Sequence, residues 1–334
     1  MSRRIIQFNP DSPVPKYRQI IDSVCQAVDR KLLKKGDKIP SINQVCADFD
    51  LSRDTVMLAF NELKAKGVIF SHPGKGYYVA SNEVQVEERI FLLFDELNSF
   101  KEDLYNSFVS NLNSKASVDI YFHHFNYQVF KNLILESAGN YTSYVIMPAT
   151  FDNVGHLVQK LPRDRVYILD RLKQELLDFP VIYQDFEQDV YDALRMAVDK
   201  LKKYRTLVFV NPGGKEPMER VYGFKRFCQE YQFDFRVVRS LADWTPGLYE
   251  AYFVPSDRTL VELVKLAMEN QFELGEKLGI VSFNDSMLKE VVAGGITTIS
   301  TDFVEMGRKL SEMVLHHRHS QVRNPSRIVF RSSL

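Results

Sequence analysis

Short apolar runs alternate with helical patterns over most of this chain. The runs lie at 90–94, 118–123, 144–147, 166–169, 206–210, 235–238, 251–254 and 279–283, and helical spacing marks 103–113, 187–202, 217–231 and 257–272. A run that is apolar at consecutive positions predicts a strand buried on both faces, which requires a parallel sheet covered by helices. The 245 residues from 90 to 334 are enough for two such units. The sequence therefore predicts a two-lobed parallel α/β domain.

The first eighty residues follow a different pattern. Apolar side chains at steps of three and four, from Tyr17 to Leu32, predict a helix over 15–34. Pro40 and Ser41 begin a second helix with Val45, Cys46 and Phe49 inward, and Ser52 caps a third that ends at Gly67. Strands at 68–71 and 76–80 flank a turn rich in glycine and proline. Three helices and a hairpin are the order of a winged helix-turn-helix.

This N-terminal part is basic. Residues 1–82 contain 13 Lys and Arg against 8 Asp and Glu, whereas the remainder contains 30 against 35. A small helical bundle that uses its hairpin only for packing is the alternative. Four consecutive polar residues, 52–55, open the third helix, where a recognition helix enters the major groove. Arginine fits the guanine O6 and N7 acceptors, and hydroxyls and helix-end amides fit phosphate oxygens. The pattern favours DNA binding.

The pieces GDKIPS (36–41), LSRDTV (51–56) and PGKGYYV (73–79) keep the order and spacing of the DNA-binding domain of the GntR family of bacterial regulators. The resemblance covers 13–80. It implies that the third helix reads DNA and that the hairpin is the wing. Asn43 and Met57 stand where the family often has arginine, so base preference is expected to rest on Arg53 and Asn43. The candidate DNA-contact residues are Ser41, Asn43, Ser52, Arg53, Thr55, His72, Gly74 and Lys75.

In the α/β part, polar residues stand directly after several predicted strands. Asp95 and Asn98 follow the first, Asp170 and Arg171 follow 166–169, Ser256 and Asp257 follow 251–254, and Asn284 and Asp285 follow 279–283. Ligands of parallel sheets bind beyond the carboxyl ends of the strands, so we expect these side chains to share a cleft. Each alone is also typical of a loop cap or turn. Their shared position is what favours a binding site.

Residues 89–333 resemble the sugar-responsive effector domain of the LacI/GalR family, through VYILDR, ERVYGFKRF, ADW, GIVSFND and ITTISTDFVEMGRKLSEMVL. The resemblance implies that Asp170, Arg220 and Asn284 bind sugar hydroxyls and that Trp244 stacks on the sugar; an anchor within a lobe is the alternative for Trp244. Ser256 and Asn284 depart from the asparagine and aspartate common in the family. The candidate effector residues are Asp95, Asn98, Phe100, Asp170, Arg220, Trp244, Ser256 and Asn284.

Other features are expected to be structural. Cys25, Cys46 and Cys228 give no disulfide framework and are predicted to be buried, as in a reducing cytoplasm. NPGGKE (211–216) lacks the spacing of a phosphate loop and is interpreted as a strand-to-helix turn. His316, His317 and His319 are interpreted as a solvated helix end, with metal binding the less favoured interpretation. His123 and His124 end a strand, where one is expected to face the cleft. Neither a membrane span, a cofactor nor an enzyme is predicted.

The sequence thus predicts a DNA-binding domain at 1–80, a linker at 81–89 and an effector-binding, dimerising domain at 90–334. This combination is similar to arabinose- or fucose-responsive regulators. It implies a cytoplasmic homodimer that binds a double-stranded operator and represses a carbohydrate-utilisation operon until a monosaccharide releases it. An activator, or a sugar-binding module whose head has a partner other than DNA, stays open. An aminotransferase fused to the same head would need a longer second domain and a cofactor lysine.

Overall fold

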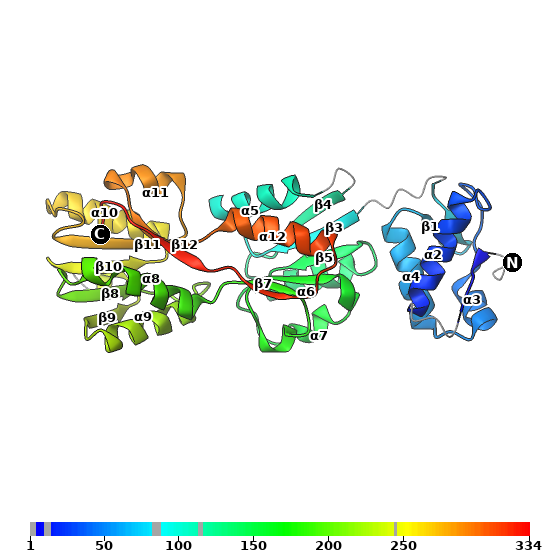
Figure 1. The fold of residues 1–334 in the computed structure, drawn as a ribbon, viewed down its shortest axis with the longest axis horizontal. Coiled ribbons are helices and arrows are strands. Elements are labelled where there is room, and N and C mark those ends of the chain that lie inside the picture. Colours follow the sequence, from blue (N-terminus) through cyan, green and yellow to red (C-terminus); the bar gives the residue numbers. More distant parts are fainter. Residues whose placement is uncertain (1–4, 10–14, 82–87, 113–115, 244–245) are drawn as a thin grey trace.

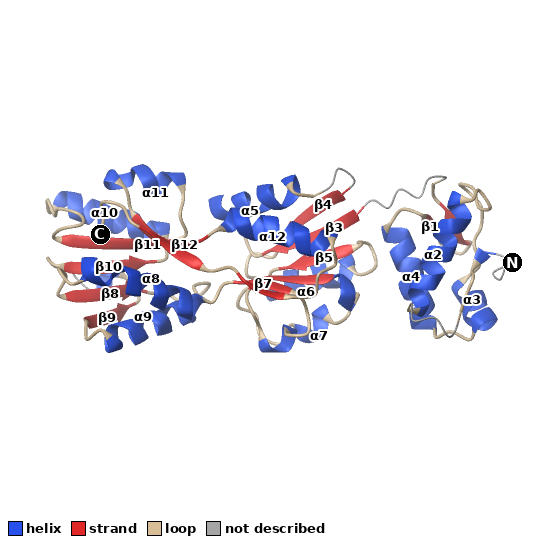
Figure 2. Ribbon diagram, in the orientation of Figure 1, coloured by secondary structure: helices blue, strands red, loops and turns tan. Residues whose placement is uncertain are grey.

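The computed structural model describes residues 5–9, 15–81, 88–112, 116–243 and 246–334. Figure 1 shows three bodies in a row: a helical head near the N-terminus, a first α/β lobe and a second α/β lobe that holds the C-terminus. In both lobes the helices cover the two faces of a central sheet (Figure 2). This arrangement explains the strands that are apolar at every position, because neither face of the sheet meets water.

The head contains α2 (Lys16–Asp29), α3 (Ile42–Phe49) and α4 (Arg53–Ala65), followed by the hairpin β1 (Ile69–His72) and β2 (Gly76–Val79). The three helices and the hairpin appear in the predicted order. Their common core includes Val24, Val45, Val56, Phe60 and Val79, each fully buried. The head is therefore a packed winged helix-turn-helix fold.

Two packing details of the head differ from the prediction. The first helix ends at Asp29, and Lys31 turns the chain at φ +59°. This turn carries Leu33 into the core and leaves Leu32 67% exposed, so Leu32 does not belong to the apolar face of the first helix as its spacing had predicted. Of the three cysteines only Cys228 is buried, because Cys25 and Cys46 lie at the edge of the head core and are half-buried.

The first lobe is built on a six-stranded parallel sheet in the order β13-β7-β6-β5-β3-β4. Its strands are β3 (Glu88–Phe94), β4 (Ala116–Phe122), β5 (Ser143–Ile146), β6 (Val166–Asp170), β7 (Val181–Tyr183) and β13 (Gln321–Arg323). Its helices are α5 (Ser99–Ser110), α6 (Tyr127–Ser137), α7 (Gly155–Val158) and α12 (Phe303–Leu315). The first strand begins at Glu88, inside the predicted linker, and residues 82–87 of that linker lie outside the described residues.

The second lobe has the sheet order β14-β12-β11-β10-β8-β9, in which β14 alone runs antiparallel to its neighbour. Its strands are β8 (Thr206–Val210), β9 (Asp234–Val238), β10 (Glu250–Val254), β11 (Leu278–Phe283), β12 (Thr297–Thr301) and β14 (Ser326–Val329). Its helices are α8 (Phe186–Leu201), α9 (Met218–Glu230), α10 (Asp257–Glu269) and α11 (Met287–Val291). The chain crosses between the lobes three times: before α8, before α12 and before β14. The two-lobed α/β prediction is confirmed.

His123 does not face the cleft, and neither it nor His124 lines the cavity described below. The ring is fully buried in the first lobe, with Nε2 3.1 Å from the carbonyl of Met147 and Nδ1 accepting from the amide of Phe125 at 3.2 Å. A neutral imidazole satisfies both contacts, and a proton on Nδ1 would break the second. Burial lowers the pKa of His123 to about 4.

This histidine is expected to make the protein sensitive to acid. An unfolded histidine has a pKa of about 6.5, so between pH 6.5 and 4 the unfolded state binds more protons and stability falls as the pH falls. We expect the free energy of unfolding to be about 2 kcal/mol lower at pH 5 than at pH 7 on account of this group. In His123→Gln, the free energies of unfolding measured with urea at pH 7 and pH 5 should differ by about 2 kcal/mol less than in the wild type. The exposed His319→Gln is the control; an equal effect of both variants would contradict the assignment.

Candidate functional site

The start of α4 presents the polar residues predicted to meet DNA. Ser52 caps the helix, accepting a hydrogen bond from the amide of Thr55 at 3.3 Å, and the two hydroxyls lie 2.8 Å apart. Ser41 caps α3 in the same way, through the amide of Gln44 at 3.2 Å. Ser41 and Ser52 are exposed and Thr55 is half-exposed. Two exposed helix N-termini with hydroxyls beside them offer donors that phosphate oxygens can accept.

Arg53 contacts Asn43, another residue that was predicted to contact DNA. Its Nη1 donates to Oδ1 of Asn43 at 2.6 Å, and both side chains are exposed. The sequence shows no partner for Arg53 within the head, because Asn43 is ten positions away on another helix. An arginine has five N–H donors, so this one hydrogen bond leaves others that a base edge can accept. Arg53 and Asn43 therefore form one unit that can present a fixed donor array to a base edge.

The wing residues form a separate group at the tip of the β1–β2 hairpin. Gly74 adopts φ +73°, a backbone conformation in which glycine is favoured, and the amide of Lys75 donates to the carbonyl of His72 at 2.9 Å. His72, Gly74 and Lys75 are all exposed. A tight exposed turn that carries a lysine can reach the DNA backbone.

The second candidate site is a cavity of about 310 Å³ between the two lobes. Seven of the eight residues predicted to bind an effector line it: Asp95, Asn98, Phe100, Asp170, Arg220, Ser256 and Asn284. Trp244, the eighth, lies outside the described residues. The seven come from the ends of β3, β6, β10 and β11 and from α5 and α9, so strand ends of both lobes meet at one place. Their convergence is the property that the sheet geometry predicts.

On the first-lobe side, Asp95 forms a buried ion pair with Lys101. Asn98 caps α5 by accepting from the amide of Lys101 at 3.1 Å, and the ring of Phe100 lies 4.8 Å from that of Phe303. Asp95 is therefore already neutralised within the protein. Desolvation raises its pKa and the neighbouring ammonium opposes that effect.

Asp170 of the first lobe and Arg220 of the second also line the cavity. Asp170 has φ +78° and accepts a hydrogen bond from Nε2 of Gln184 at 2.6 Å. The guanidinium of Arg220 pairs with Glu216 at 3.3 Å and lies over the ring of Phe283, 4.6 Å from its centroid. Arg220 is almost completely buried in this position. The cavity thus combines a carboxylate and a guanidinium with aromatic faces.

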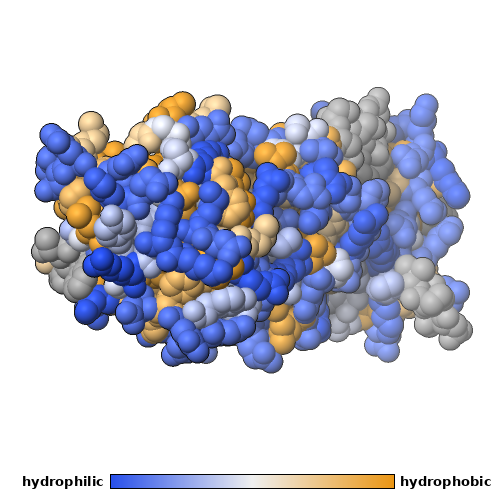
Figure 3. All heavy atoms as spheres, turned by 60° about the vertical axis from the view of Figure 1, so that its left-hand side comes forward, coloured by the Kyte–Doolittle hydropathy of each residue, from blue (hydrophilic) through white to orange (hydrophobic). Residues whose placement is uncertain are grey.

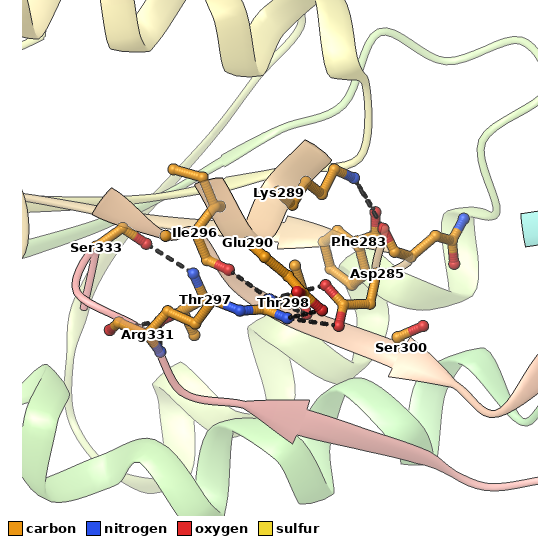
Figure 4. Close-up of polar contacts among 12 residues, drawn as sticks. Phe283, Asp285, Lys289, Glu290, Ile296, Thr297, Thr298, Ser300, Arg331 and Ser333 are labelled. Atoms are coloured by element: carbon orange, nitrogen blue, oxygen red, sulfur yellow. Dashed lines mark hydrogen bonds and ion pairs between the residues drawn. The ribbon is translucent and has the colours of Figure 1, made fainter. Parts of the chain in front are cut away.

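The loop after β11 carries Asn284 at φ +60° and is held from both sides (Figure 4). Lys289 Nζ donates to the carbonyls of Phe283 and Asn284 at 2.7 and 2.8 Å. Arg331 donates to both carboxylate oxygens of Asp285, at 2.7 and 2.8 Å. These contacts fix the loop, so Asn284 reaches the cavity from a rigid support.

Several lining residues were not singled out from the sequence as effector contacts. Lys215, in the segment NPGGKE, reaches across the cleft to Glu96 at 2.6 Å. Arg171, which the sequence placed at the cleft without an effector role, reaches Glu219 at 3.2 Å. The segment is a strand-to-helix connection, as predicted, but it also contributes to the cavity. Its position at the carboxyl end of β8 is the signal that could have identified it. Other lining residues of this kind are Phe125, Gln184, Phe186, Phe283 and Lys289.

Both parts of the chain match known families. Residues 16–79 match the bacterial regulatory proteins of the gntR family, and residues 183–334 match the periplasmic binding protein-like domain. The HTH-type transcriptional repressor YtrA of Bacillus subtilis is 30% identical over 95 residues, which are 28% of this chain and 73% of YtrA. The chain belongs to the gntR family. It is a DNA-binding transcription regulator of the repressor type with a periplasmic-binding-protein-like effector domain.

Other relatives of this gntR-family chain are similar only in the head. The mannosyl-D-glycerate transport/metabolism system repressor MngR of Escherichia coli is 36% identical over 90 residues, which are 27% of this chain and 35% of MngR. The YdfD regulator of Bacillus subtilis is 39% identical over 69 residues, 21% of this chain and 14% of that protein. Because most of these relatives continue outside the matched region, their substrates do not transfer to this chain.

Solved structures match the two lobes. A LacI family regulator from Silicibacter pomeroyi superposes with a TM-score of 0.64 at 16% identity, covering 74% of this chain and 98% of its own. A LacI family regulator from Enterococcus faecium with bound ribose superposes with a TM-score of 0.58 at 18% identity, covering 74% of this chain and 98% of its own. A lac repressor dimer bound to operator superposes with a TM-score of 0.61 at 15% identity, covering 75% of this chain and 94% of its own. At identities this low, the structural similarity establishes only the fold of the effector domain. Within the described part of the chain, no helix is long and apolar enough to cross a membrane.

Proposed function

We propose that this regulator represses a carbohydrate-utilisation operon and is released from its operator by a monosaccharide bound between the two lobes. The observation that carries the proposal is the convergence of Asp170, Arg220 and Asn284 on one interlobe cavity. Planar carboxylate, guanidinium and amide groups match the paired hydroxyls of a sugar. A volume of about 310 Å³ is at the lower end of small-molecule pockets, as a monosaccharide requires.

Aromatic rings supply the other half of sugar recognition. Phe100, Phe125, Phe186, Phe283 and Phe303 all line the cavity. The apolar C–H faces of a sugar pack on flat rings, while its hydroxyls need fixed polar partners. Both surfaces are present in this cavity, and the bound ribose of the Enterococcus faecium structure belongs to a protein of the same effector fold.

The charges of the cavity favour a neutral sugar over a sugar phosphate. Lys101, Arg171, Lys215, Arg220 and Lys289 are each paired with a carboxylate, and Arg258, the sixth lining cation, is exposed. Apart from Arg258, these cations could pair with a phosphate dianion only by giving up their carboxylates, whereas neutral hydroxyls can bind without separating any ion pair. The proposed effector is therefore an unphosphorylated pentose, hexose or deoxyhexose.

Two copies of the chain are proposed to bind the operator, because helix-turn-helix dimers match the symmetry of palindromic DNA. The short helix α11 exposes Met287, Leu288 and Val291, with 85%, 65% and 72% of their surfaces accessible. Figure 3 shows apolar atoms at the upper edge of the second lobe, where α11 lies in Figure 1. Contiguous exposed apolar side chains of this kind mark association surfaces.

The sugar must favour one arrangement of this dimer over another, since a ligand shifts a conformational equilibrium only by its differential affinity for the two states.

Isothermal titration with L-arabinose, D-ribose, D-xylose, D-glucose, D-galactose and L-fucose, and with their phosphates, tests the effector. One unphosphorylated sugar is expected to bind and to weaken operator binding in a gel shift. A response only to phosphates would contradict the neutral-sugar assignment, and no binding by any compound would contradict the effector role. A sugar that strengthened operator binding would reverse the proposed sign.

Asp170→Asn should weaken binding of the responding sugar about 10- to 150-fold, because a hydrogen bond to a charged group contributes about 1.5–3 kcal/mol. Asparagine tolerates the positive φ at this position, so the fold should be retained. Titration calorimetry measures the loss. Asp178→Asn is the matched control in the same lobe, since Asp178 pairs with Arg163 on the surface. Equal affinities for wild type and Asp170→Asn would exclude Asp170 from the site.

A further inference from the structure

The DNA-binding head makes specific contacts with the first lobe. The hydroxyl of Tyr17 in α2 donates to Oδ2 of Asp164 at 2.8 Å, and Glu62 in α4 pairs with Arg165 at 3.4 Å. Gly139 lies so close to Asn61 that an added Cβ would be 3.0 Å from the Asn61 Cβ. Burial, together with Asp164, raises the pKa of Tyr17 to about 12, so its hydroxyl stays protonated and donates. Both α2 and α4 of the head therefore contact the first lobe.

Arg165 is the centre of this contact. The residue is only 4% exposed, although it lies on a short turn immediately before β6. Besides Glu62 it contacts His317, with Nη1 2.9 Å from Nε2, and Tyr167 lies 3.2 Å from the same imidazole. The Glu62 side chain is 10% exposed and also pairs with Lys66. A guanidinium so deeply buried requires these partners, since an unpaired buried charge is strongly unfavourable.

His317 connects this contact to the effector cavity through α12. The helix begins at Phe303, which lines the cavity and packs against the ring of Phe100, and His317 follows its last residue by two positions. Gly307 lets α12 pack directly on α5, because a Cβ there would lie 2.4 Å from the carbonyl oxygen of Leu104. In Figure 1, α12 runs along the first lobe from the second lobe toward the head. A well-packed helix of 13 residues transmits a displacement at one end to the other.

The contact leaves the predicted DNA-reading residues free. Ser52 and Arg53 are exposed at the start of α4, whereas Asn61 and Glu62 lie in its last turns and Lys66 follows its last residue. The head can therefore meet DNA while it is held by the lobe. The contact sets the orientation of the head, which in a dimer also sets the spacing between two recognition helices.

We propose that Glu62, Arg165 and His317 form a latch that holds the head on the first lobe, and that α12 couples the effector cavity to this latch. Formation of the latch depends on the described contacts alone, whereas its response to a sugar rests on the function proposed above. Closure of the lobes moves the start of α12, shifts His317 relative to Arg165 and so changes the orientation of the head.

Disulfide trapping in the full chain tests the latch without any ligand. In Asn61→Cys/Gly139→Cys the two Cβ atoms would lie 3.0 Å apart, within about 1 Å of the separation in a natural disulfide, so mild oxidation should link positions 61 and 139. Peptide mapping separates this link from reactions of the three native cysteines. Adding Arg165→Ala should reduce the linked fraction severalfold, and adding Arg163→Ala, an exposed arginine on the same turn, should not. Equal linking in all three proteins would overturn the latch.

Small-angle X-ray scattering supplies a second measurement, because cysteine at 139 must adopt φ +77° and this could prevent the link. Arg165→Ala in the otherwise native chain is expected to show a larger maximum dimension than the wild type and than Arg163→Ala. Superposable scattering curves would overturn the latch even if no disulfide forms.

The coupling step is tested with the six sugars named above. In Arg165→Ala the responding sugar should bind as in the wild type, within about twofold, while its effect on operator affinity should fall about tenfold or more, as loss of a typical allosteric coupling would produce. An undiminished sugar effect on operator affinity would overturn the coupling through the latch. If no sugar binds either protein, the proposed effector function fails and the trapping and scattering results still decide the latch.

Discussion

Lys101→Met is expected to lower the free energy of unfolding by about 3–5 kcal/mol, because it leaves the Asp95 carboxylate buried without a counter-charge. The two side chains are 9% and 8% exposed, and they form the ion pair at the first-lobe side of the cavity. Methionine retains the length and apolar stem of lysine, so the packing around α5 changes little. Urea unfolding at pH 7 measures the effect.

The double variant Asp95→Asn/Lys101→Met separates the buried charge from the loss of lysine itself. It removes both charges and should recover most of the stability that Lys101→Met loses, since replacing a whole buried pair is often close to neutral. Lys202→Met, on the surface beside Asp199, should cost less than about 1 kcal/mol. A single variant as stable as the wild type would show that Asp95 is solvated or protonated without Lys101.

Arg53→Ala is expected to weaken operator binding by about 1–3 kcal/mol, or about 5- to 150-fold, because a bidentate arginine–base contact contributes that much discrimination. The exposed side chain is not needed for the core, so the melting temperature should not change. Gel shifts at fixed salt concentration with promoter DNA of its own operon measure the effect, and scrambled DNA gives the non-specific part.

Arg30→Ala is the matched control, because Arg30 is also exposed in the head and its removal changes the net charge equally. It should affect specific and scrambled DNA to the same small extent. Asn43→Ala should be non-additive with Arg53→Ala, since the two side chains share a hydrogen bond of 2.6 Å. Unchanged affinity of Arg53→Ala for promoter DNA would show that the start of α4 does not read bases.

Much of the fold follows from local patterns. The eight apolar runs all become strands, and Ser41, Ser52 and Asn98 act as helix caps. These features depend on hydrophobic periodicity and on hydrogen bonds to nearby amides, both of which are visible in a short stretch of sequence. The strands β7, β12, β13 and β14 were not predicted. Two of them, β7 and β13, contain only three residues, and β13 completes a sheet whose neighbouring strand, β7, lies far back in the chain.

The positions of the candidate site residues divide in the same way. The carboxyl ends of parallel strands share one edge of a sheet, so Asp95, Asp170, Ser256 and Asn284 could be predicted to face the cleft. The ion pairs at this edge could not be predicted. The contacts of Lys101 with Asp95 and of Lys215 with Glu96 depend on how a helix or a loop returns to the edge of the sheet. Likewise, the hydrogen bond between Arg53 and Asn43 depends on the angle between two helices.

The sequence by itself determined the class of each domain and several of the residues that line the cavity, because repeating local patterns and strand ends encode both. The tertiary structure alone decided which charges are neutralised, and that the chain crosses three times between the lobes. It also decided that Arg165 joins Glu62, 103 positions earlier, to His317, 152 positions later. The ion pair between Arg165 and Glu62 requires two distant segments to exclude water together, and no short stretch of sequence carries that information.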